Sequence, residues 1–472
     1  MISRRHFLET SGCGIGSLAL LHLLAKDCKS SADTKTQWDG ERNPIAKAKR
    51  VIQLFMNGGA SQMDLFDYKP LLQARHGQKF TPTTSERIEA ATSVPGNVLG
   101  SPFKFAQHGQ TGRWVSELLP HTAKHVDDMA LMLSMTSKTN VHGPASYLMN
   151  TGFLLPGFPC FGAWVSYGLG TLNENLPTFV VLPDARGLPY NQRGNFSSGF
   201  LPVTHQGTAI HASHSEPLHG LRAPSNASFI THQAELDGLA LLGRTNRDQL
   251  EIDYDPRLEA RVRAYELAAK MQLSAPEVFD LSQETESTMQ AYGLRNPATE
   301  DFGKRCLIAR RMIERGVRVV QVWSGSNGPT GNWDNHTSIV KELPPMTEST
   351  DQPTAALLAD LKARGLLDDT LLLWNTEFGR MPFSQGSEGR DHNGGASIGW
   401  MAGAGVRPGI AVGETDEWSW KAVRDPISNY DFHATVLHLL GLDHEQLVYQ
   451  HNGANRRLTD VHGHVVQSLL TE

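Results

Sequence analysis

Short apolar runs alternate with amphipathic stretches along most of the chain. Between the runs, apolar residues at helical spacing predict helices over Trp114–Val126, Leu258–Met271, Lys304–Arg315 and Ala355–Ala363. The runs themselves are typical of strands buried on both faces of a parallel sheet, and they are Val51–Met56, Ala130–Met135, Thr178–Leu182, Val317–Trp323 and Leu371–Asn375. The alternation predicts an α/β fold with a doubly wound, mostly parallel sheet and helices on both faces. Gly316 and Gly365 are expected C-caps of the helices that precede them.

Residues 184–246 interrupt this alternation. The segment is rich in Gly, Pro, Asn and His, and it lacks apolar periodicity. Loops of this length inside a compact domain are usually functional or disordered. We therefore interpret it as a loop-rich insertion, a lid or substrate-side segment, with side chains available for contacts at Tyr190, Asn191, Arg193 and Phe200.

The N-terminus carries the features of a twin-arginine export signal. Arg4 and Arg5 precede an apolar stretch from Gly12 to Ala25. This stretch is shorter than the roughly twenty residues that span a bilayer, so no transmembrane segment is expected beyond the leader. We expect a signal peptide at 1–32, a linker at 33–49, and a single α/β domain at 50–472 that resides in the periplasm or outside the cell.

Composition narrows the possible partners. The 472 residues include 43 Lys and Arg and 49 Asp and Glu, for a net charge of −6. No basic run is long enough to follow a phosphate backbone, so a nucleic-acid partner is not expected. The pairing of Cys160 with Cys306 and the oligomeric state stay open at this point.

Polar residues follow directly after several of the predicted strands. In an open parallel sheet, ligands bind outside the carboxyl ends of the strands, so these residues are expected to converge. Histidines together with carboxylates favour zinc or manganese over an all-oxygen calcium site, although calcium remains possible. The candidate metal ligands are Asn57, Asp64, Asp334, His336, Glu377, Asp391 and His392, and the candidate catalytic residues are His142, Glu377, Arg380 and Arg390.

At these residues the chain resembles the alkaline-phosphatase-like superfamily, and most closely the 1501 family of domains of unknown function, which are bacterial, exported and sulfatase-like. The resemblance rests on the leader and on the motifs VIQLFMNGGASQMDLFDYKP, TNVHGPASYLMNTG, NFSSGFLPVTHQGT, GNWDNH, NTEFGRMP and GRDHN. These motifs extend from Val51 to beyond His392, over most of the chain that follows the leader.

The resemblance implies divalent metals at the strand ends. This chain also departs from the superfamily pattern at several positions. Asn57 stands where the superfamily has the first-strand Asp, and Glu377 with Phe378 replaces an Asp-His pair. His142 occupies the nucleophile position, where formylglycine sulfatases need Cys or Ser, so sulfatase chemistry of that type is not implied. One metal position remains, formed by Asp334, His336 and His392.

Three functional hypotheses follow. The first is a metal-dependent hydrolase of a sulfate or phosphate ester, on a small molecule or polysaccharide, in which metal-activated water attacks, His142 or Glu377 is the base, and Arg380 or Arg390 binds the anion. The second makes His142 a nucleophile that forms phosphohistidine. The third is a non-catalytic binding or scaffolding protein for an anionic polysaccharide. In the first two, His142 is expected at the N-terminus of a helix whose first turn contains Pro144.

Overall fold

The structure is a computed structural model that describes residues 46–81, 88, 92, 94–213, 231–252, 262, 266, 277–386 and 388–471. The chain divides into two compact units, residues 1–39 and 40–472. The first unit, and with it the expected signal peptide, lies outside the described residues, as does most of the predicted helix Leu258–Met271.

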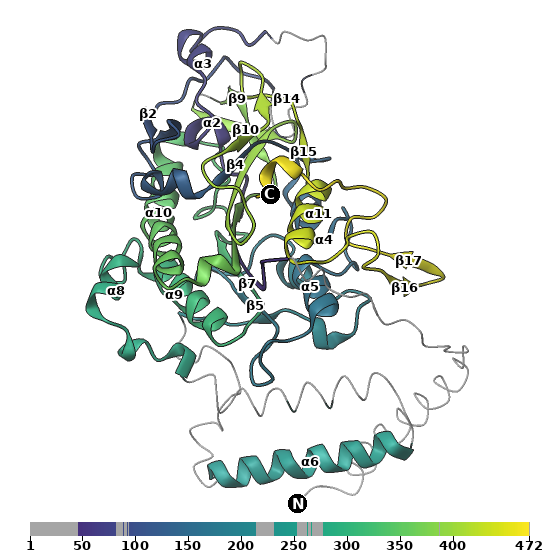
Figure 1. Cartoon of the computed structure of the whole chain (residues 1–472). Helices are drawn as coiled ribbons and strands as arrows, with labels where there is room; N and C mark the ends of the chain where they lie inside the picture. Colours follow the sequence, from purple (N-terminus) through teal and green to yellow (C-terminus); the bar gives the residue numbers. More distant parts are fainter. Residues whose placement is uncertain are drawn as a thin grey trace, which may run out of the picture. The chain divides into compact units, whose positions relative to one another are not determined.

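A large, mostly parallel sheet forms the centre of the second unit (Figure 1). Its strand order is β12–β4–β11–β8–β1–β7–β5–β6, and β15 pairs with β4. Among the described strands of this sheet, only β11 runs antiparallel to its neighbours, β4 and β8. The strands are β1 (Arg50–Met56), β4 (Ala130–Thr136), β5 (Phe179–Leu182), β6 (Thr208–Ala209), β7 (Val319–Ser324), β8 (Thr370–Asn375), β11 (Ser397–Gly403), β12 (Ala411–Val412) and β15 (Ile427–Ser428).

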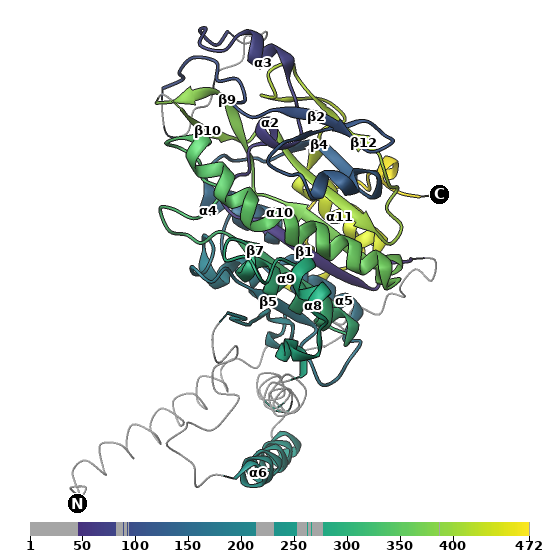
Figure 2. The same ribbon diagram turned by 90° about the vertical axis from the view of Figure 1, so that its left-hand side faces the viewer.

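Helices cover both faces of this sheet, as the sequence pattern predicts. Helices α9 and α10 lie on one face, and α4, α5 and α11 lie on the other (Figures 1 and 2). The described helices are α2 (Gln62–Leu65), α3 (Pro70–Ala74), α4 (His142–Thr151), α5 (Phe161–Leu169), α6 (His232–Ile252), α8 (Glu286–Ala291), α9 (Glu300–Glu314), α10 (Ile339–Ala363) and α11 (Asn429–Leu439). None of them is both long and apolar enough to cross a membrane.

Short 3₁₀ helices and two-stranded hairpins complete the described part of the chain. The 3₁₀ helices are η1 (Thr122–Asp128), η2 (Gln192–Phe196), η3 (Val203–His205), η4 (Leu281–Gln283), η5 (Leu366–Asp368) and η6 (Gln467–Leu469). The hairpins pair β2 (Phe105–His108) with β3 (Arg113–Ser116), β9 (Gly379–Gln385) with β10 (Gly389–Asn393), β13 (Glu414–Thr415) with β14 (Ala422–Arg424), and β16 (Tyr449–His451) with β17 (Ala454–Arg456).

All of the predicted strands are present, with ends shifted by one or two residues. The helix predicted over Trp114–Val126 is wrong, because its first residues belong to β3 and its last to η1. Pro120 lies between these elements, and a proline in a helix interior removes a hydrogen bond and clashes with the preceding turn. The segment 184–246, predicted as loop, contains η2, η3 and β6 and the start of α6.

A buried row of amides joins three strands to helix α4. The Gln53 amide donates to Asn375 Oδ1 at 3.0 Å, and the Gln321 amide donates to Gln53 Oε1 at 2.8 Å. Gln321 also donates to Asn150 Oδ1, on α4, at 3.2 Å. Buried amides are costly to leave unpaired, so this row fixes the position of α4, whose first residue is His142, over the sheet.

Candidate metal centre

Four side chains converge beside the carboxyl ends of the parallel strands. His142 begins α4 in the connection after β4, Asp334 and His336 lie in the loop after β7, and His392 lies on β10. One possible ligand atom from each of the four lies within 4.8 Å of the others. Asp334, His336 and His392 are the residues that the resemblance assigns to one metal position, and the structure brings these three together and adds His142.

Close backbone contacts hold the loop that carries Asp334. The Trp333 N–H donates to the Asn57 carbonyl at 3.0 Å, which ties this loop to the end of β1. Gly58 has a φ of 124°, and a Cβ there would lie 2.6 Å from the Asp334 nitrogen. A larger residue would therefore meet both an unfavourable backbone conformation and a clash. Gly389, on β10, allows a still closer approach to the His336 carbonyl.

The three histidines are held in the same tautomer by three different acceptors. His142 Nδ1 lies 2.7 Å from Glu377 Oε1, and His392 Nδ1 lies 2.8 Å from the Asn140 carbonyl oxygen. His336 Nδ1 contacts Oε1 of Gln385. Because each partner is an oxygen that only accepts, each Nδ1 carries a hydrogen, and in the neutral imidazole each Nε2 presents a lone pair. Imidazoles that ligate metals are typically oriented in this way.

The three Nε2 atoms meet at one carboxylate oxygen. Asp334 Oδ1 lies 3.1 Å from Nε2 of His142, 2.8 Å from that of His336 and 3.1 Å from that of His392. His336 Nε2 and His392 Nε2 are 2.7 Å apart, and His142 Nε2 is buried without a hydrogen-bond partner. Lone pairs this close repel each other unless a cation or a proton lies between them. The donor set, three imidazoles and one carboxylate, fits a divalent transition metal.

The electrostatic environment of Asp334 and His392 keeps both in the form that binds a metal. Burial alone would raise the pKa of Asp334, but the Arg380 guanidinium and the three histidines lower it well below its usual range. Burial lowers the pKa of His392 to about 4, although Asp334 opposes this shift. Burial also lowers the pKa of His142, but Asp334 and Glu377 raise it by more. Asp334 is therefore a carboxylate and His392 a neutral imidazole at neutral pH.

Glu377 lies behind His142 rather than among the converging ligand atoms. Its carboxylate accepts hydrogen bonds from His142 Nδ1, from the Gly58 N–H at 2.9 Å and from the Thr376 hydroxyl at 3.0 Å. The side chain is almost completely buried. The expectation that Glu377 is a metal ligand or general base does not match this geometry, in which it orients and polarises His142.

The two candidate arginines are used inside the protein. Arg380 is fully buried and donates to Asp334 Oδ1 at 2.6 Å and to the carbonyls of Gly58, Gly59, Trp333 and Arg390. Arg390 is also fully buried and donates to both carboxylate oxygens of Asp64, at 2.6 and 3.0 Å. The expectation that these guanidinium groups bind an anionic substrate is therefore not supported, and Asp64 is occupied by an internal ion pair.

Two other predicted metal ligands, Asp391 and Asn57, make their hydrogen bonds to groups outside the cluster of four converging side chains. The Asp391 carboxylate accepts the Thr92 hydroxyl at 2.8 Å and the His392 N–H at 2.7 Å. The Asn57 amide donates to the Ser326 carbonyl at 3.0 Å, whereas its Oδ1 is buried without a hydrogen-bond partner. The structure thus does not bring Asp391 into the cluster, and it leaves one neutral oxygen of Asn57 available.

Tyr190 and Asn191, from the predicted substrate-side segment, contact the centre and the first turn of helix α4. The Tyr190 ring stacks on His142 with centroids 4.4 Å apart, and its hydroxyl lies 3.5 Å from Asp334 Oδ2. The next residue, Asn191, has a φ of 60° and donates to the Gly143 carbonyl at 2.6 Å. Gln385, which orients His336, was not identified from the sequence, because an isolated glutamine carries no recognisable pattern.

Cys160 and Cys306, whose pairing the sequence left open, are both buried free thiols. They contribute no ligand to the cluster.

Comparisons with known proteins give distant structural neighbours. No curated protein matches the chain in sequence. The lipoteichoic acid synthase LtaP from Listeria monocytogenes is similar over 84% of this chain and 73% of that chain, with 10% identity and a TM-score of 0.37. The PsFucS1 sulfatase from Pseudoalteromonas sp. is similar over 87% of this chain and 74% of that chain, with 12% identity and a TM-score of 0.34. The alkaline phosphatase from the Antarctic bacterium TAB5 is similar over 84% of this chain and 98% of that chain, with 10% identity and a TM-score of 0.34. TM-scores this low carry no information about function.

Sequence comparison with protein families gives a much firmer result. One family model matches residues 48–470. This range is nearly the whole of the described chain and includes every residue of the metal centre. The resemblance stated from the motifs is thereby confirmed. The chain belongs to the DUF1501 family of proteins of unknown function.

Proposed function

We propose that the protein is an exported, metal-dependent hydrolase that acts on a phosphate or sulfate ester. The observation that carries this proposal is the convergence of three Nε2 lone pairs, each fixed by a hydrogen bond at the opposite ring nitrogen, on Asp334. A divalent cation held by these donors would lower the pKa of a coordinated water to about 7 and offset charge on the ester. Zinc or manganese suits the donor set best.

The chain's own residues determine what the centre attracts. Asp334 supplies the one negative charge among the four donors, and the Arg380 guanidinium lies 2.6 Å from it. The donors therefore do not neutralise a divalent cation, so the centre attracts anions. The Tyr190 hydroxyl is neutral at ordinary pH, because burial raises its pKa. It can donate a hydrogen bond to an ester oxygen, and the Tyr190 ring shields His142 from water.

His142 acts as a ligand in this proposal rather than as a nucleophile. Its Nε2 is directed at the same Asp334 oxygen as those of His336 and His392, and its Nδ1 is bound to Glu377. A nucleophile would need one nitrogen directed toward the substrate. Neither nitrogen of His142 is available in this way, so an attack by water fits the geometry better.

The test is hydrolysis of an aryl phosphate and an aryl sulfate by protein loaded with zinc, manganese or calcium. We expect activity with at least one combination, and a loss of at least about 100-fold in His142→Ala and His392→Ala. His438→Ala is the matched control, because this histidine is exposed on α11. Thermal unfolding of each variant reports whether the fold is kept.

Two results would overturn the proposal in different ways. Full activity in a folded His392→Ala variant would remove the cluster from catalysis. No hydrolysis by any metal-loaded wild-type sample would favour a non-catalytic binding protein on the same fold.

The export part of the proposal rests on Arg4, Arg5 and the apolar stretch that follows them. A twin-arginine leader suits a protein that folds around a metal before it crosses the membrane, and it would deliver the protein to the periplasm or the cell exterior.

A further inference from the structure

The turn 190–195 connects helix α4 to the loop that carries Asp334. The Tyr190 ring stacks on His142, the first residue of α4. The Tyr190 hydroxyl oxygen accepts a hydrogen bond from the Asn332 amide at 3.3 Å, and Asn332 Oδ1 accepts the Asp334 N–H at 3.1 Å. Because Asn332 occupies the phenol oxygen as an acceptor, the phenol hydrogen is directed at Asp334 Oδ2, 3.5 Å away, or at an ester oxygen bound beside it.

The backbone of this turn has an unfavourable conformation. Asn191 has a φ of 60° and Gln192 a φ of 49°. Left-handed conformations cost free energy in residues that carry a Cβ, and asparagine tolerates them better than glutamine does. Two in succession persist only where the surrounding structure holds them. The orientation of Tyr190 therefore depends on contacts between the turn and the rest of the protein.

Asn195 makes such a contact with Tyr190 itself. Its amide nitrogen donates to the Tyr190 carbonyl, and its Oδ1 accepts the Ser146 hydroxyl at 3.1 Å. A carbonyl only accepts, so the amide nitrogen must face Tyr190 and Oδ1 must face Ser146. Asn195 and Ser146 are both completely buried. Removal of either side chain would leave a polar partner unpaired away from water, which is costly.

Ser146 connects this contact to the buried row of amides in the sheet. Asn150, one turn further along α4, donates to the Ser146 carbonyl at 2.8 Å. Asn150 Oδ1 in turn accepts from Gln321, on β7, at 3.2 Å. A series of buried polar contacts therefore extends from the middle of the sheet, through α4, to Tyr190.

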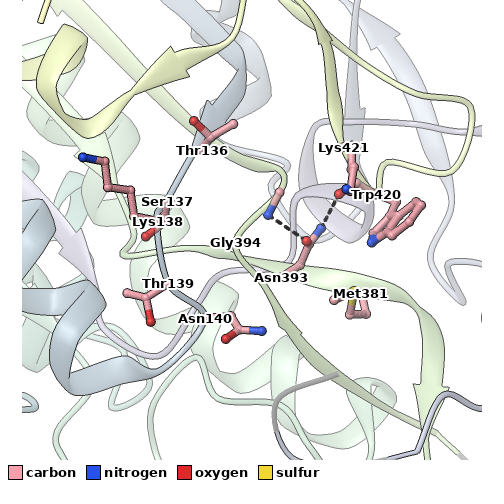
Figure 3. A pocket seen from close by; sticks show the side chains of 11 residues that line it. Thr136, Ser137, Lys138, Thr139, Asn140, Met381, Asn393, Gly394, Trp420 and Lys421 are labelled. Carbon is pink, nitrogen blue, oxygen red and sulfur yellow. Dashed lines mark hydrogen bonds between the residues drawn. The ribbon is translucent and has the colours of Figure 1, made fainter. Parts of the chain in front are cut away.

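His392 has a separate support in the wall of a cavity of about 430 Å³ (Figure 3). Asn393, the next residue, lines this cavity. It donates to the Trp420 carbonyl at 2.8 Å and accepts the Gly395 N–H at 2.9 Å, as the dashed lines in Figure 3 show. None of these contacts involves Tyr190, so Asn393 provides a comparison at the same centre.

We propose that Asn195 is a positioning residue that, together with Ser146, holds the Tyr190 ring on His142 and the Tyr190 hydroxyl beside Asp334. The inference rests on the proposed function, in which this hydroxyl donates to an ester oxygen, and it adds the residues that fix the donor in place. Without Asn195 the turn leaves its left-handed conformation, and Tyr190 moves away from His142.

Fluorine NMR of protein labelled with 3-fluorotyrosine observes Tyr190 directly and requires no hydrolysis. Spectra are recorded with an equimolar amount of zinc, and Tyr190→Phe assigns the resonance. In Asn195→Ala, we expect the Tyr190 resonance to shift toward its position in the unfolded protein, while those of Tyr292 and Tyr430 stay in place and show that the fold is kept. Ser146→Ala should give a smaller shift in the same direction.

Asn173→Ala is the matched control for this measurement. The Asn173 amide also donates to a backbone carbonyl, that of Arg315, but in the connection that precedes β7. The variant should leave the Tyr190 resonance where it is in the wild type. An unmoved Tyr190 resonance in both Asn195→Ala and Ser146→Ala, or an equal shift in Asn173→Ala, would overturn the inference.

A double-mutant cycle measures the effect on catalysis. In metal-loaded protein, Tyr190→Phe and Asn195→Ala should each lower kcat/KM for an aryl ester by roughly tenfold, and the double variant should lose little more, because both changes remove the same donor. Asn393→Ala, by contrast, should lower kcat/KM by the same factor in the Tyr190→Phe background as in the wild type. Multiplicative effects of Tyr190→Phe and Asn195→Ala would contradict a role through Tyr190. If the wild type hydrolyses no ester, the proposed function fails, and the Tyr190 resonance still decides whether Asn195 positions this side chain.

Discussion

The three imidazoles of the metal centre differ in what holds them. His142 is bound by the carboxylate of Glu377, His336 by the amide of Gln385, and His392 by the backbone carbonyl of Asn140. A carboxylate partner makes an imidazole more basic than a neutral oxygen does, so His142 is expected to be the strongest nitrogen donor of the three. A substitution at Glu377 therefore tests the centre without removing a ligand.

We expect Glu377→Gln to weaken metal binding by about 10- to 100-fold while the fold is kept, because glutamine keeps an acceptor oxygen but lacks the charge. Competition with a chromophoric chelator measures the affinity. Glu445→Gln, at a surface position, serves as the control. An unchanged affinity in Glu377→Gln would show that the contact with His142 is only structural.

The sequence identified most members of the centre but could not assign their roles. It predicted Asp334, His336 and His392 as metal ligands, and the structure brings these three together, because each follows a strand that ends at the same edge of the sheet. It also proposed Asp64 and Asp391, whose carboxylates are occupied by Arg390 and by Thr92. A carboxylate next to a strand end looks the same in sequence whether it faces the site or an internal partner, because the partner comes from a distant segment.

At the scale of elements, strands were predicted better than helices. The buried strands are short apolar runs, and their length of five to seven residues distinguishes them from helices. Helix α10 extends from Ile339 through Pro344, Pro345 and Pro353, although the sequence predicted only Ala355–Ala363. Its buried apolar residues, which include Leu343 and Leu357, compensate for the prolines. Helices that are stabilised mainly by tertiary packing carry only a weak helical signal in their local sequence.

Helix α11 contains a buried histidine that should make stability depend on pH. His433 is fully buried, and burial lowers its pKa to about 4 from the ordinary 6.5. As the pH falls below 6.5, the unfolded chain takes up a proton at this residue before the folded protein does. Stability is therefore lost between about pH 6.5 and pH 4.

Urea unfolding at pH 7.5 and pH 5.0 measures this loss. We expect His433 to account for on the order of 2 kcal/mol of the decrease in the free energy of unfolding. His433→Leu should lack that part of the decrease, whereas His438→Ala, at an exposed position of the same helix, should keep it. Equal pH dependence in the wild type and His433→Leu would contradict the assignment.

At the scale of the whole molecule, the topology of the sheet assembles the centre. The parallel strands β1, β4, β7 and β8 end at one edge, and the β9–β10 hairpin adds His392 there. Ligands that are up to 250 residues apart in the chain, His142 and His392, thus meet only after the sheet has formed. The metal centre should therefore be assembled only in the folded protein, as the proposed export route requires.

Export of the folded protein can be tested at the leader. We expect the variant Arg4→Lys/Arg5→Lys to accumulate in the cytoplasm as a folded precursor, because the twin-arginine route depends on this pair. Cell fractionation with immunoblotting, together with protease resistance of the retained form, measures the effect. Lys47→Arg, downstream of the leader, is a suitable control. Normal export of the leader variant would contradict the proposed route.

Metal analysis of the purified protein tests the central claim most directly. Inductively coupled plasma mass spectrometry is applied to wild-type protein, purified without chelator, and to the variant His336→Ala/His392→Ala. The account predicts about one divalent ion per wild-type chain and nearly none in the variant, with Lys124→Ala/Lys341→Ala as the control. A metal-free wild type that takes up no zinc, manganese or calcium on incubation, or a folded variant with the wild-type metal content, would contradict it.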